Sequence, residues 1–249
     1  MKHLIDMHCH IIAGVDDGAK DVTESINLLK LEKEQGVDRI ILTPHYRVGM
    51  FETPQYIIDR EYAKLCLLEK EMNLGISLFL GCEFHSCETM IDDLFFKTRR
   101  TMVSTKFVLV EFSSLDSYSK IRKQIYELVS NGWIPIIAHI ERYPAFVENF
   151  RNVHECKRLG AYMQITSGAI LGKTGWRMKK LCKELIKRNL VDFIASDAHN
   201  IKNRKPDLGE CAKYLEKKYG QEYVHRILIK NPEMVLGGFA KHANNLFSS

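Results

Sequence analysis

Seven short apolar runs rich in β-branched residues alternate along the chain with longer amphipathic segments. The runs are Leu4 to His8, Arg39 to Thr43, Ser77 to Glu83, Phe107 to Phe112, Ile134 to His139, Ala161 to Thr166 and Val191 to Ser196. A strand followed by a helix, repeated in this way, is typical of parallel strands joined by right-handed crossovers. Because no Pro-, Gly- or Ser-rich linker divides the series, we predict a closed or nearly closed β/α barrel, with a doubly wound open sheet as the alternative.

The segments between the runs predict helices over Val22 to Gln35, Pro54 to Met72, Met90 to Arg99, Tyr118 to Ser130, Val147 to Leu159, Trp176 to Asn189 and Asp207 to Gly220. The first helix carries its own boundary signals. Asp21 can cap the free N–H groups with Glu24 three positions later, and Gly36 stands where a left-handed terminating residue belongs.

Length and composition fit this architecture. A chain of 249 residues with 45% hydrophobic and 27% charged residues can bury a sizeable core, and a single barrel of about 250 residues requires no second domain. We expect one α/β domain over residues 1–249, with a poorly ordered tail from Gly237 to Ser249.

The charge distribution and the cysteines predict the class of partner and the cellular compartment. The net charge of +5 is scattered without a run of five like charges, which disfavours a nucleic-acid partner and weakly favours an anionic substrate. Charged residues and histidines interrupt the first apolar stretch, and no 18 apolar residues run together, so we expect neither a signal peptide nor a membrane-embedded segment. Seven cysteines without a CxxC pair predict free thiols in a reducing compartment, and hence a cytoplasmic protein.

Metal-capable side chains stand at the ends of six of the seven runs. They are His8 and His10 after the first run, then His45, Glu83, Glu111 and His139, and finally Asp197 and His199. Residues two apart in a strand project to the same side, so His8 and His10 should face together. The carboxyl ends of parallel barrel strands open onto one face, where all these side chains would converge. Bound cations would offset the cost of burying such acids without partners.

The ligand chemistry is imidazole and carboxylate without thiolate. That set suits manganese, iron or zinc in a multinuclear site and disfavours a structural zinc site rich in cysteine. Asp17, in the loop after the first run, is a further oxygen ligand candidate, whereas the adjacent Asp16 is better explained as a turn residue or cap.

Six segments, IDMHCHIIAGVDDGA, TPHY, GCEF, VEFS, IAHIERY and IASDAHN, resemble the PHP-domain (polymerase and histidinol phosphatase) metallohydrolases from about Ile5 to Arg204. The nearest branch is the bacterial protein-tyrosine phosphatases of capsule and exopolysaccharide gene clusters. The resemblance implies a distorted seven-stranded (β/α)7 barrel of the PHP type with three metal ions, usually manganese, at the strand ends. It also implies a phosphatase whose partner is a phosphotyrosine-bearing bacterial tyrosine kinase that controls capsular or exopolysaccharide synthesis.

The same resemblance implies a role for each candidate ligand. One metal would take His8, His10, Glu83 and Asp197, a second Glu111 and His139 with Glu83 as the bridge, and a third His45, Asp17 and His199. Arg142 and Arg204 match arginines that this family places around the phosphate, where a planar guanidinium binds two oxygens at once. Departures from the family pattern at IIAG, Ile140 and QITSGAI concern loop shape and substrate preference, and they remove no proposed ligand.

The expected mechanism is attack on phosphorus by a metal-activated hydroxide, with Arg142 and Arg204 stabilising the phosphate charge. His199 or a metal-bound water would supply a proton to the leaving group. Cys182 to Arg188 has the C-x5-R spacing of cysteine-dependent tyrosine phosphatases, but CKELIKR consists of helix formers inside an amphipathic segment. We therefore predict a buried helical cysteine without a catalytic role.

Other functions fit the same constellation. The chain could hydrolyse histidinol phosphate, another small phosphomonoester or nucleic-acid ends, act as an amidohydrolase, which also opens with HxH, or bind metal as a non-catalytic interaction module. The GVDDGA and IAHIERY segments favour the tyrosine phosphatase, and the two internal glutamates with DxH disfavour the amidohydrolase. His85, two residues after Glu83, could also face the site.

Overall fold

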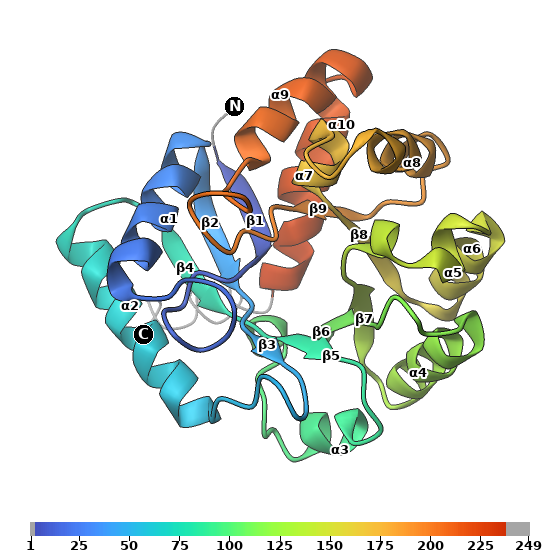
Figure 1. Ribbon diagram of the computed structural model, residues 1–249, viewed down its shortest axis with the longest axis horizontal. Coiled ribbons are helices and arrows are strands. Elements are labelled where there is room, and N and C mark those ends of the chain that lie inside the picture. Colours follow the sequence, from blue (N-terminus) through green and yellow to red (C-terminus); the bar gives the residue numbers. More distant parts are fainter. Residues whose placement is uncertain (1–2, 238–249) are drawn as a thin grey trace, which may run out of the picture.

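The computed structural model describes residues 3–237, in which parallel strands lie at the centre and helices surround them (Figure 1). The strands are β1 (Leu4–Cys9), β2 (Val37–Leu42), β3 (His45–Tyr46), β4 (Ser77–Leu80), β5 (Glu83–His85), β6 (Phe107–Glu111), β7 (Ile134–Ile137), β8 (Tyr162–Thr166) and β9 (Phe193–Ala195). They form two sheets, in the orders β1-β2-β4 and β3-β5-β6-β7-β8-β9. All seven predicted strands are confirmed. The run from Ser77 to Glu83 is divided into β4 and β5, and the run from Arg39 to Thr43 is followed by the short β3.

The interruptions distort the barrel. After β2, Thr43 and Pro44 precede β3, and Pro44 has no N–H to donate to a sheet. After β4, the chain bends at Gly81, where an added Cβ would lie 2.9 Å from the sulfur of Met102 in the 3-10 turn η1 (Met102–Ser104). The amide of Glu83 donates to the carbonyl of Pro44 at 3.1 Å, which keeps the displaced strand ends adjacent. The continuations β3 and β5 therefore pair with the second sheet while β2 and β4 stay in the first.

The last strand returns to the first at the carboxyl end. Cys9 and Ala198 form a parallel bridge. The amide of Asp197 donates to the carbonyl of His8 at 2.9 Å, and the amide of His10 donates to the carbonyl of Ala198 at 2.8 Å. The strands thus form the predicted distorted seven-stranded barrel rather than a doubly wound open sheet, and the first and last motifs of the chain become neighbours.

Two hydrophobic clusters stabilise this arrangement. The smaller one takes side chains from β1, β2, β6, β7 and β9, such as Ile5, Met7 and Ile136, and fills the barrel interior. The larger one packs the outer faces of the strands against the helices, with Leu28 and Leu29 of the first helix among its fully buried members. Burial of apolar surface on both sides of the strands is what a parallel sheet requires.

The helices are α1 (Val22–Glu34), α2 (Gln55–Glu71), α3 (Met90–Phe95), α4 (Tyr118–Ser130), α5 (Pro144–Val147), α6 (Phe150–Leu159), α7 (Ser167–Leu171), α8 (Trp176–Lys187), α9 (Leu208–Tyr219) and α10 (Gln221–His225), with the 3-10 turn η2 (Ile140–Arg142) and the π-helix η3 (Arg226–Lys230). The predicted cap of α1 is confirmed, because the Asp21 side chain accepts from the amide of Glu24 and Gly36 adopts a φ of +83°. Two predicted boundaries are wrong. The helix from Met90 ends at Phe95, and the segment 147–159 is divided where Asn149 caps α6.

The predicted poorly ordered tail, Gly237 to Ser249, lies outside the described residues except for Gly237 itself. Between residues 3 and 237, no helix combines the length and the apolar character needed to cross a bilayer.

Candidate metal centre

The carboxyl ends of the strands bring the predicted ligands together. Three overlapping groups place potential ligand atoms within 4.8 Å of one another: His8, His10, Glu83 and Asp197; His10, Asp17, His45 and His199; and His45, Glu83 and Glu111. The first group has the residues expected for the first metal. The second group has those expected for the third metal, with His10 in addition, and the third group has those expected for the second metal, with His45 in place of His139.

The first group is the most deeply buried. The Nε2 atoms of His8 and His10 lie 3.2 Å apart, which confirms that the two imidazoles face together. Both also approach Oε2 of Glu83, at 3.0 and 3.2 Å, and Oδ1 of Asp197, at 3.5 and 3.6 Å. Four side chains from β1, β5 and the end of β9 therefore surround one point.

Glu83 is shared among the groups. Its Oε2 lies 3.2 Å from Nδ1 of His45, and its Oε1 lies 2.8 Å from Nε2 of His139. His139 also approaches Oε2 of Glu111, at 3.8 Å, so it adjoins the third group although it is not counted in it. A carboxylate with different neighbours on its two oxygens could hold two cations, one through each oxygen.

Asp17 lies between the remaining imidazoles. Its Oδ1 is 3.6 Å from Nε2 of His45 and 3.4 Å from Nε2 of His199. Asp17 is exposed at its outer edge, whereas His199 is buried. This group therefore forms the solvent-facing side of the cluster.

The donor set fits cations. Among the buried side-chain atoms that lack a hydrogen-bond partner in the described part of the chain, four belong to candidate ligands in the cluster: Nδ1 of His45, Oε2 of Glu83, Oδ1 of Asp197 and Nε2 of His199. Burying a polar atom without a partner costs free energy, so several such atoms in one cluster indicate that a bound group, such as a cation, satisfies them. Imidazole and carboxylate groups at these separations supply the ligands that manganese, iron and zinc accept.

The electrostatics also demand positive charge. Burial alone would lower the pKa of His10, but Asp16 and Glu83 outweigh it and raise that pKa to about 10. Burial would raise the pKa of Glu83, but the surrounding histidines hold it well below its usual range. Burial would also raise the pKa of Asp197, but Arg142 and, after it, His8 hold that pKa well below its usual range. Burial lowers the pKa of His199 to about 4, which leaves it as the neutral imidazole that binds metals. The acids remain ionised and stabilise protons or cations between them.

Neighbouring side chains orient the ligands. Asp16 accepts from the amide of Gly18 at 2.9 Å, as predicted for a turn residue, and its other oxygen lies 2.7 Å from Nδ1 of His10. The hydroxyl of Tyr143 lies 3.1 Å from Nδ1 of His139. Such contacts fix the orientation of a metal-binding imidazole. The sequence analysis did not predict the contact between Asp16 and His10, although the two residues are only six positions apart.

Two further residues complete this surrounding layer. Gln164, in the unusual QITSGAI segment, accepts from the amide of His139 at 2.7 Å and lies 3.4 Å from Nδ1 of His8. His85 does face the site, since its Nδ1 lies 3.1 Å from Oε1 of Glu111. No sequence signal singled out Gln164, because it acts across strands.

Two candidate ligands occupy unusual backbone conformations. His139 has a φ of 34° and Asp197 a φ of 54°, both in the left-handed region that non-glycine residues rarely adopt. Such conformations persist where the surrounding structure imposes them, and they cluster at functional sites. The backbone here turns sharply after β7 and β9 and directs both side chains inward.

Arg142 and Arg204, the two arginines expected around a phosphate, flank Asp197. Their Nη2 atoms lie 2.5 and 2.7 Å from Oδ2 of Asp197, and both side chains remain more than one-third exposed. Both line an open cleft of about 710 Å³ beside the cluster. Guanidinium groups held by a buried acid yet open to solvent can receive an anionic ligand.

The C-x5-R segment lies in α8, as predicted. Cys182 is fully buried, and burial raises the pKa of its thiol far above the ordinary value. Arg188 lies with its guanidinium carbon 5.1 Å from the ring centre of Phe150. A protonated, inaccessible thiol cannot serve as a nucleophile.

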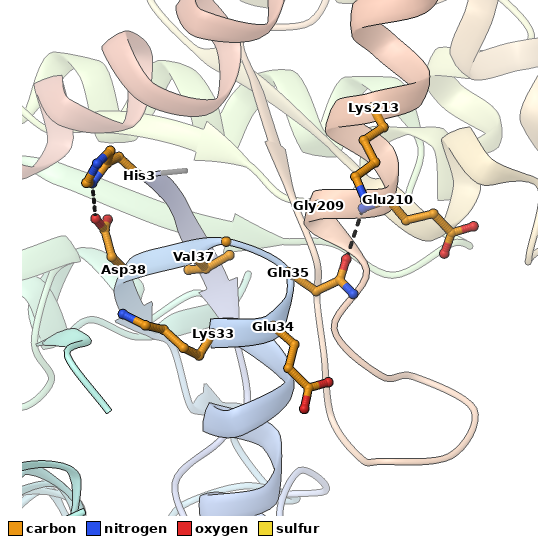
Figure 2. Close-up of a pocket in the computed structure, with 10 residues that line it drawn as sticks. His3, Lys33, Glu34, Gln35, Val37, Asp38, Gly209, Glu210 and Lys213 are labelled. Atoms are coloured by element: carbon orange, nitrogen blue, oxygen red, sulfur yellow. Dashed lines mark hydrogen bonds and ion pairs between the residues drawn. The ribbon is translucent and has the colours of Figure 1, made fainter. Parts of the chain in front are cut away.

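Another cavity lies at the opposite end of the barrel (Figure 2). It adjoins His3 and Val37, at the amino ends of β1 and β2, and its volume is about 460 Å³. Its lining contains both lysines and acids, and these side chains do not form a group that suits one ligand. In this figure His3 points to Asp38, and Gln35 accepts from the amide of Glu210.

Comparison with known proteins places this centre in a family. Residues 4–237 match the model of the family described as capsular polysaccharide synthesis, CpsB/CapC. The chain belongs to the CpsB/CapC family. This membership confirms the resemblance inferred from the motifs.

Curated members of the CpsB/CapC family resemble most of the chain. The tyrosine-protein phosphatase CpsB of Streptococcus agalactiae serotype V is 35% identical, over 94% of this chain and 98% of its own length. The tyrosine-protein phosphatase YwqE of Bacillus subtilis is 33% identical over 94% of this chain and 91% of its own. The putative tyrosine-protein phosphatase CapC of Staphylococcus aureus is 37% identical over 81% and 79%.

Solved structures agree. A chain from the crystal structures of YwqE from B. subtilis and CpsB from Streptococcus pneumoniae, described as unique metal-dependent tyrosine phosphatases, superposes with a TM-score of 0.87 at 32% identity, covering 94% of each chain. Histidinol phosphate phosphatase from Lactococcus lactis has a TM-score of 0.60 at 17% identity, covering 88% of this chain and 95% of its own. The second likeness concerns the fold alone, and it agrees with the PHP type of barrel.

Proposed function

We propose that this protein is a metal-dependent protein-tyrosine phosphatase acting on a bacterial tyrosine kinase that controls capsular or exopolysaccharide synthesis. The observation that carries the proposal is the pair of arginines on Asp197, which joins a phosphate-binding group to a cluster of candidate metal ligands. The CpsB and YwqE relatives, which carry the name of tyrosine phosphatase, support the same substrate.

The proposed cofactor is manganese, with three ions per chain and with iron or zinc as alternatives. The proposed ligands are His8, His10, Asp17, His45, Glu83, Glu111, His139, Asp197 and His199. Overlap of the three groups at His10, His45 and Glu83 supports a multinuclear centre rather than separate sites. The description of the related structures as metal-dependent supports a metal without identifying it.

Bound divalent cations would supply a water of lowered pKa and a Lewis acid for the phosphate. The residues of the chain bind and orient the substrate. Arg142 and Arg204 donate to the phosphate oxygens from the side of Asp197, whose carboxylate holds both guanidinium groups in place. Because the tyrosine leaving group has a pKa near 10, it requires little protonation.

The proposed proton donor is His199 or a metal-bound water. Burial lowers the pKa of His199 to about 4, and its Nε2 lies 3.4 Å from Oδ1 of Asp17, so His199 is proposed as a ligand as well. His199 thus contributes to the proposed site by holding the solvent-facing side of the cluster, beside Asp17.

The test compares kcat/KM for a phosphotyrosyl peptide, the matching phosphoseryl peptide and histidinol phosphate, each with manganese and after chelation. We expect the phosphotyrosyl peptide to be preferred, and chelation to abolish turnover until manganese is restored. Preference for histidinol phosphate would favour the small-molecule alternative. Metal binding without turnover of any of the three would favour the non-catalytic interaction module.

The proposed location is the cytoplasm. Seven free cysteines support it, since the structure pairs none of those in the described part of the chain. The proposed partner is the kinase itself, whose phosphotyrosines would enter the cleft beside Arg142 and Arg204.

A further inference from the structure

The cleft beside the metal centre extends well beyond the two arginines. Its lining includes Lys202, Asn203 and Lys205 from the loop between β9 and α9, together with Lys173 after α7. A volume of about 710 Å³ falls in the range of sites for drug-sized ligands and exceeds the needs of one phosphoryl group. The cleft therefore has room for more of the substrate than its phosphate.

The charge in this cleft is positive and only partly compensated. Lys173 is paired, with its Nζ 2.8 Å from Glu210 and 3.1 Å from Asp207. Lys202 and Lys205 are exposed, and neither forms an ion pair within residues 3–237. Two unpaired ammonium groups therefore face the space next to the phosphate-binding arginines.

The loop that carries these lysines is ordered by its own hydrogen bonds. Oδ1 of Asn200 accepts from the amides of Lys202, Asn203 and Arg204, at 3.0, 2.9 and 3.2 Å. The amide of His199 donates to the carbonyl of Arg204 at 2.8 Å, which ties the loop to a candidate metal ligand. The backbone of Lys202 is thus held relative to the metal centre, and Lys205 directly follows the bonded Arg204.

We propose that Lys202 and Lys205 form a subsite for an anionic side chain next to the phosphotyrosine, either a carboxylate or a second phosphate. This inference rests on the proposed phosphatase function and names the substrate class of that site. An extended peptide advances about 3.3 Å per residue, so the residues flanking a phosphotyrosine held by Arg142 and Arg204 come within reach of a long lysine side chain. A phosphate, with up to two charges, binds this subsite more strongly than a carboxylate.

The test uses three peptides that differ only beside the phosphotyrosine: neutral neighbours, glutamate neighbours, or a second phosphotyrosine. The measured quantity is the ratio of kcat/KM for each anionic peptide to that for the neutral one, with the full-length, manganese-loaded enzyme. Exposed ion pairs are individually weak, so we expect a ratio of about 3 to 10 for glutamate and a larger ratio for the second phosphate. The ratio should fall at high salt, because screening weakens exposed pairs.

The variants isolate the lysines from general charge effects. The double variant Lys202→Gln/Lys205→Gln should bring the ratios close to one, and Lys202→Arg/Lys205→Arg should restore them. The matched control is Lys213→Gln/Lys217→Gln on α9, which removes the same charge; Lys213 lines the cavity at the other end of the barrel (Figure 2). This control should keep the wild-type ratios.

The outcomes separate this inference from the proposed function. Equal rates on all three peptides, or ratios that survive Lys202→Gln/Lys205→Gln, would overturn the subsite while leaving the phosphatase intact. Absence of turnover on every peptide would overturn both.

Discussion

At the residue scale, Arg142 contacts a candidate metal ligand and lines the cleft proposed for the substrate. Its guanidinium contacts Asp197 while more than one-third of the side chain remains exposed to the cleft. Replacing Arg142 with lysine keeps the charge but removes the planar pair of donors. We expect kcat/KM for a phosphotyrosyl peptide to fall by about 10²-fold, as for the loss of one donor to a developing oxyanion.

The control for Arg142→Lys is Arg188→Lys, because Arg188 packs against Phe150 and lies outside the cleft lining. Arg188→Lys should retain wild-type kcat/KM. Equal losses in the two variants would contradict the role assigned to Arg142.

Cys182 offers a second prediction at this scale. Because the thiol is buried in α8 and remains protonated, Cys182→Ser should keep kcat within about twofold of wild type. Steady-state kinetics on the same peptide measure it, with circular dichroism to confirm folding. A collapse of kcat in a folded variant would revive a thiol mechanism.

Individual ligand candidates were predictable because their residue types stand at strand ends, where a parallel barrel brings them together. Asp16, Tyr143 and Gln164 were not identified as orienting residues. Gln164 contacts His139 from another strand, and Asp16 and Tyr143 meet their histidines through the turn that each loop makes. Sequence spacing locates strand ends. Sequence spacing does not specify which side-chain atoms form hydrogen bonds with one another.

At the scale of elements, the seven strands and most helices followed from hydrophobic periodicity, but the breaks in two strands did not. The run from Ser77 to Glu83 is continuous in its apolar character, and its division depends on Gly81 meeting Met102 of η1, a contact about twenty residues away in the chain. Short helices such as α5 and α7 were also missed, because four or five residues carry too little periodicity.

The loop after β1 depends on a close approach that only glycine permits. A Cβ at Gly18 would lie 2.1 Å from the carbonyl oxygen of His10 and 2.6 Å from its Cβ. Gly18→Ala should therefore displace Asp16 and Asp17, destabilise the protein by about 1–3 kcal/mol and lower its Tm by about 3–10 °C.

Manganese affinity should fall in the same variant, since the loop carries a candidate ligand and the partner of His10. Calorimetry and metal titration measure the two effects. Gly237→Ala is the control, because within residues 3–237 the added Cβ meets nothing within 4 Å apart from its chain neighbours and the backbone of its own helix. Unchanged Tm and affinity in Gly18→Ala would show that the loop can move without consequence.

At the scale of the whole molecule, backbone contacts between the ends of the first and last strands bring the first and last motifs together. Alternation of strands and helices predicted a barrel, and its seven strand positions are confirmed. The sequence did not indicate where the strands divide between two sheets. That depends on Pro44 and Gly81, which divide the strands between two sheets.

Metal removal tests the molecule as a unit, because the proposed ligands come from nearly every strand. If cations hold the carboxyl ends together, purified protein should contain about three equivalents of transition metal by elemental analysis. Ligand binding at 100 times its Kd stabilises a fold by about 2.7 kcal/mol. Chelation should therefore lower the Tm by about 5–10 °C, and manganese should restore it.

The variant Glu83→Gln also tests whether cations hold the carboxyl ends together. Glu83 faces His8, His45 and His139 and belongs to two of the three groups. The variant should lose more than one equivalent of metal and most of the manganese-dependent rise in Tm. The control Glu155→Gln changes a partly exposed glutamate of α6 that pairs with Arg122 of α4, far from the candidate ligands in sequence, and this variant should keep both the metal content and the rise in Tm. A Glu83→Gln variant with full metal content would mean that this carboxylate bridges nothing, and the centre would then consist of independent sites.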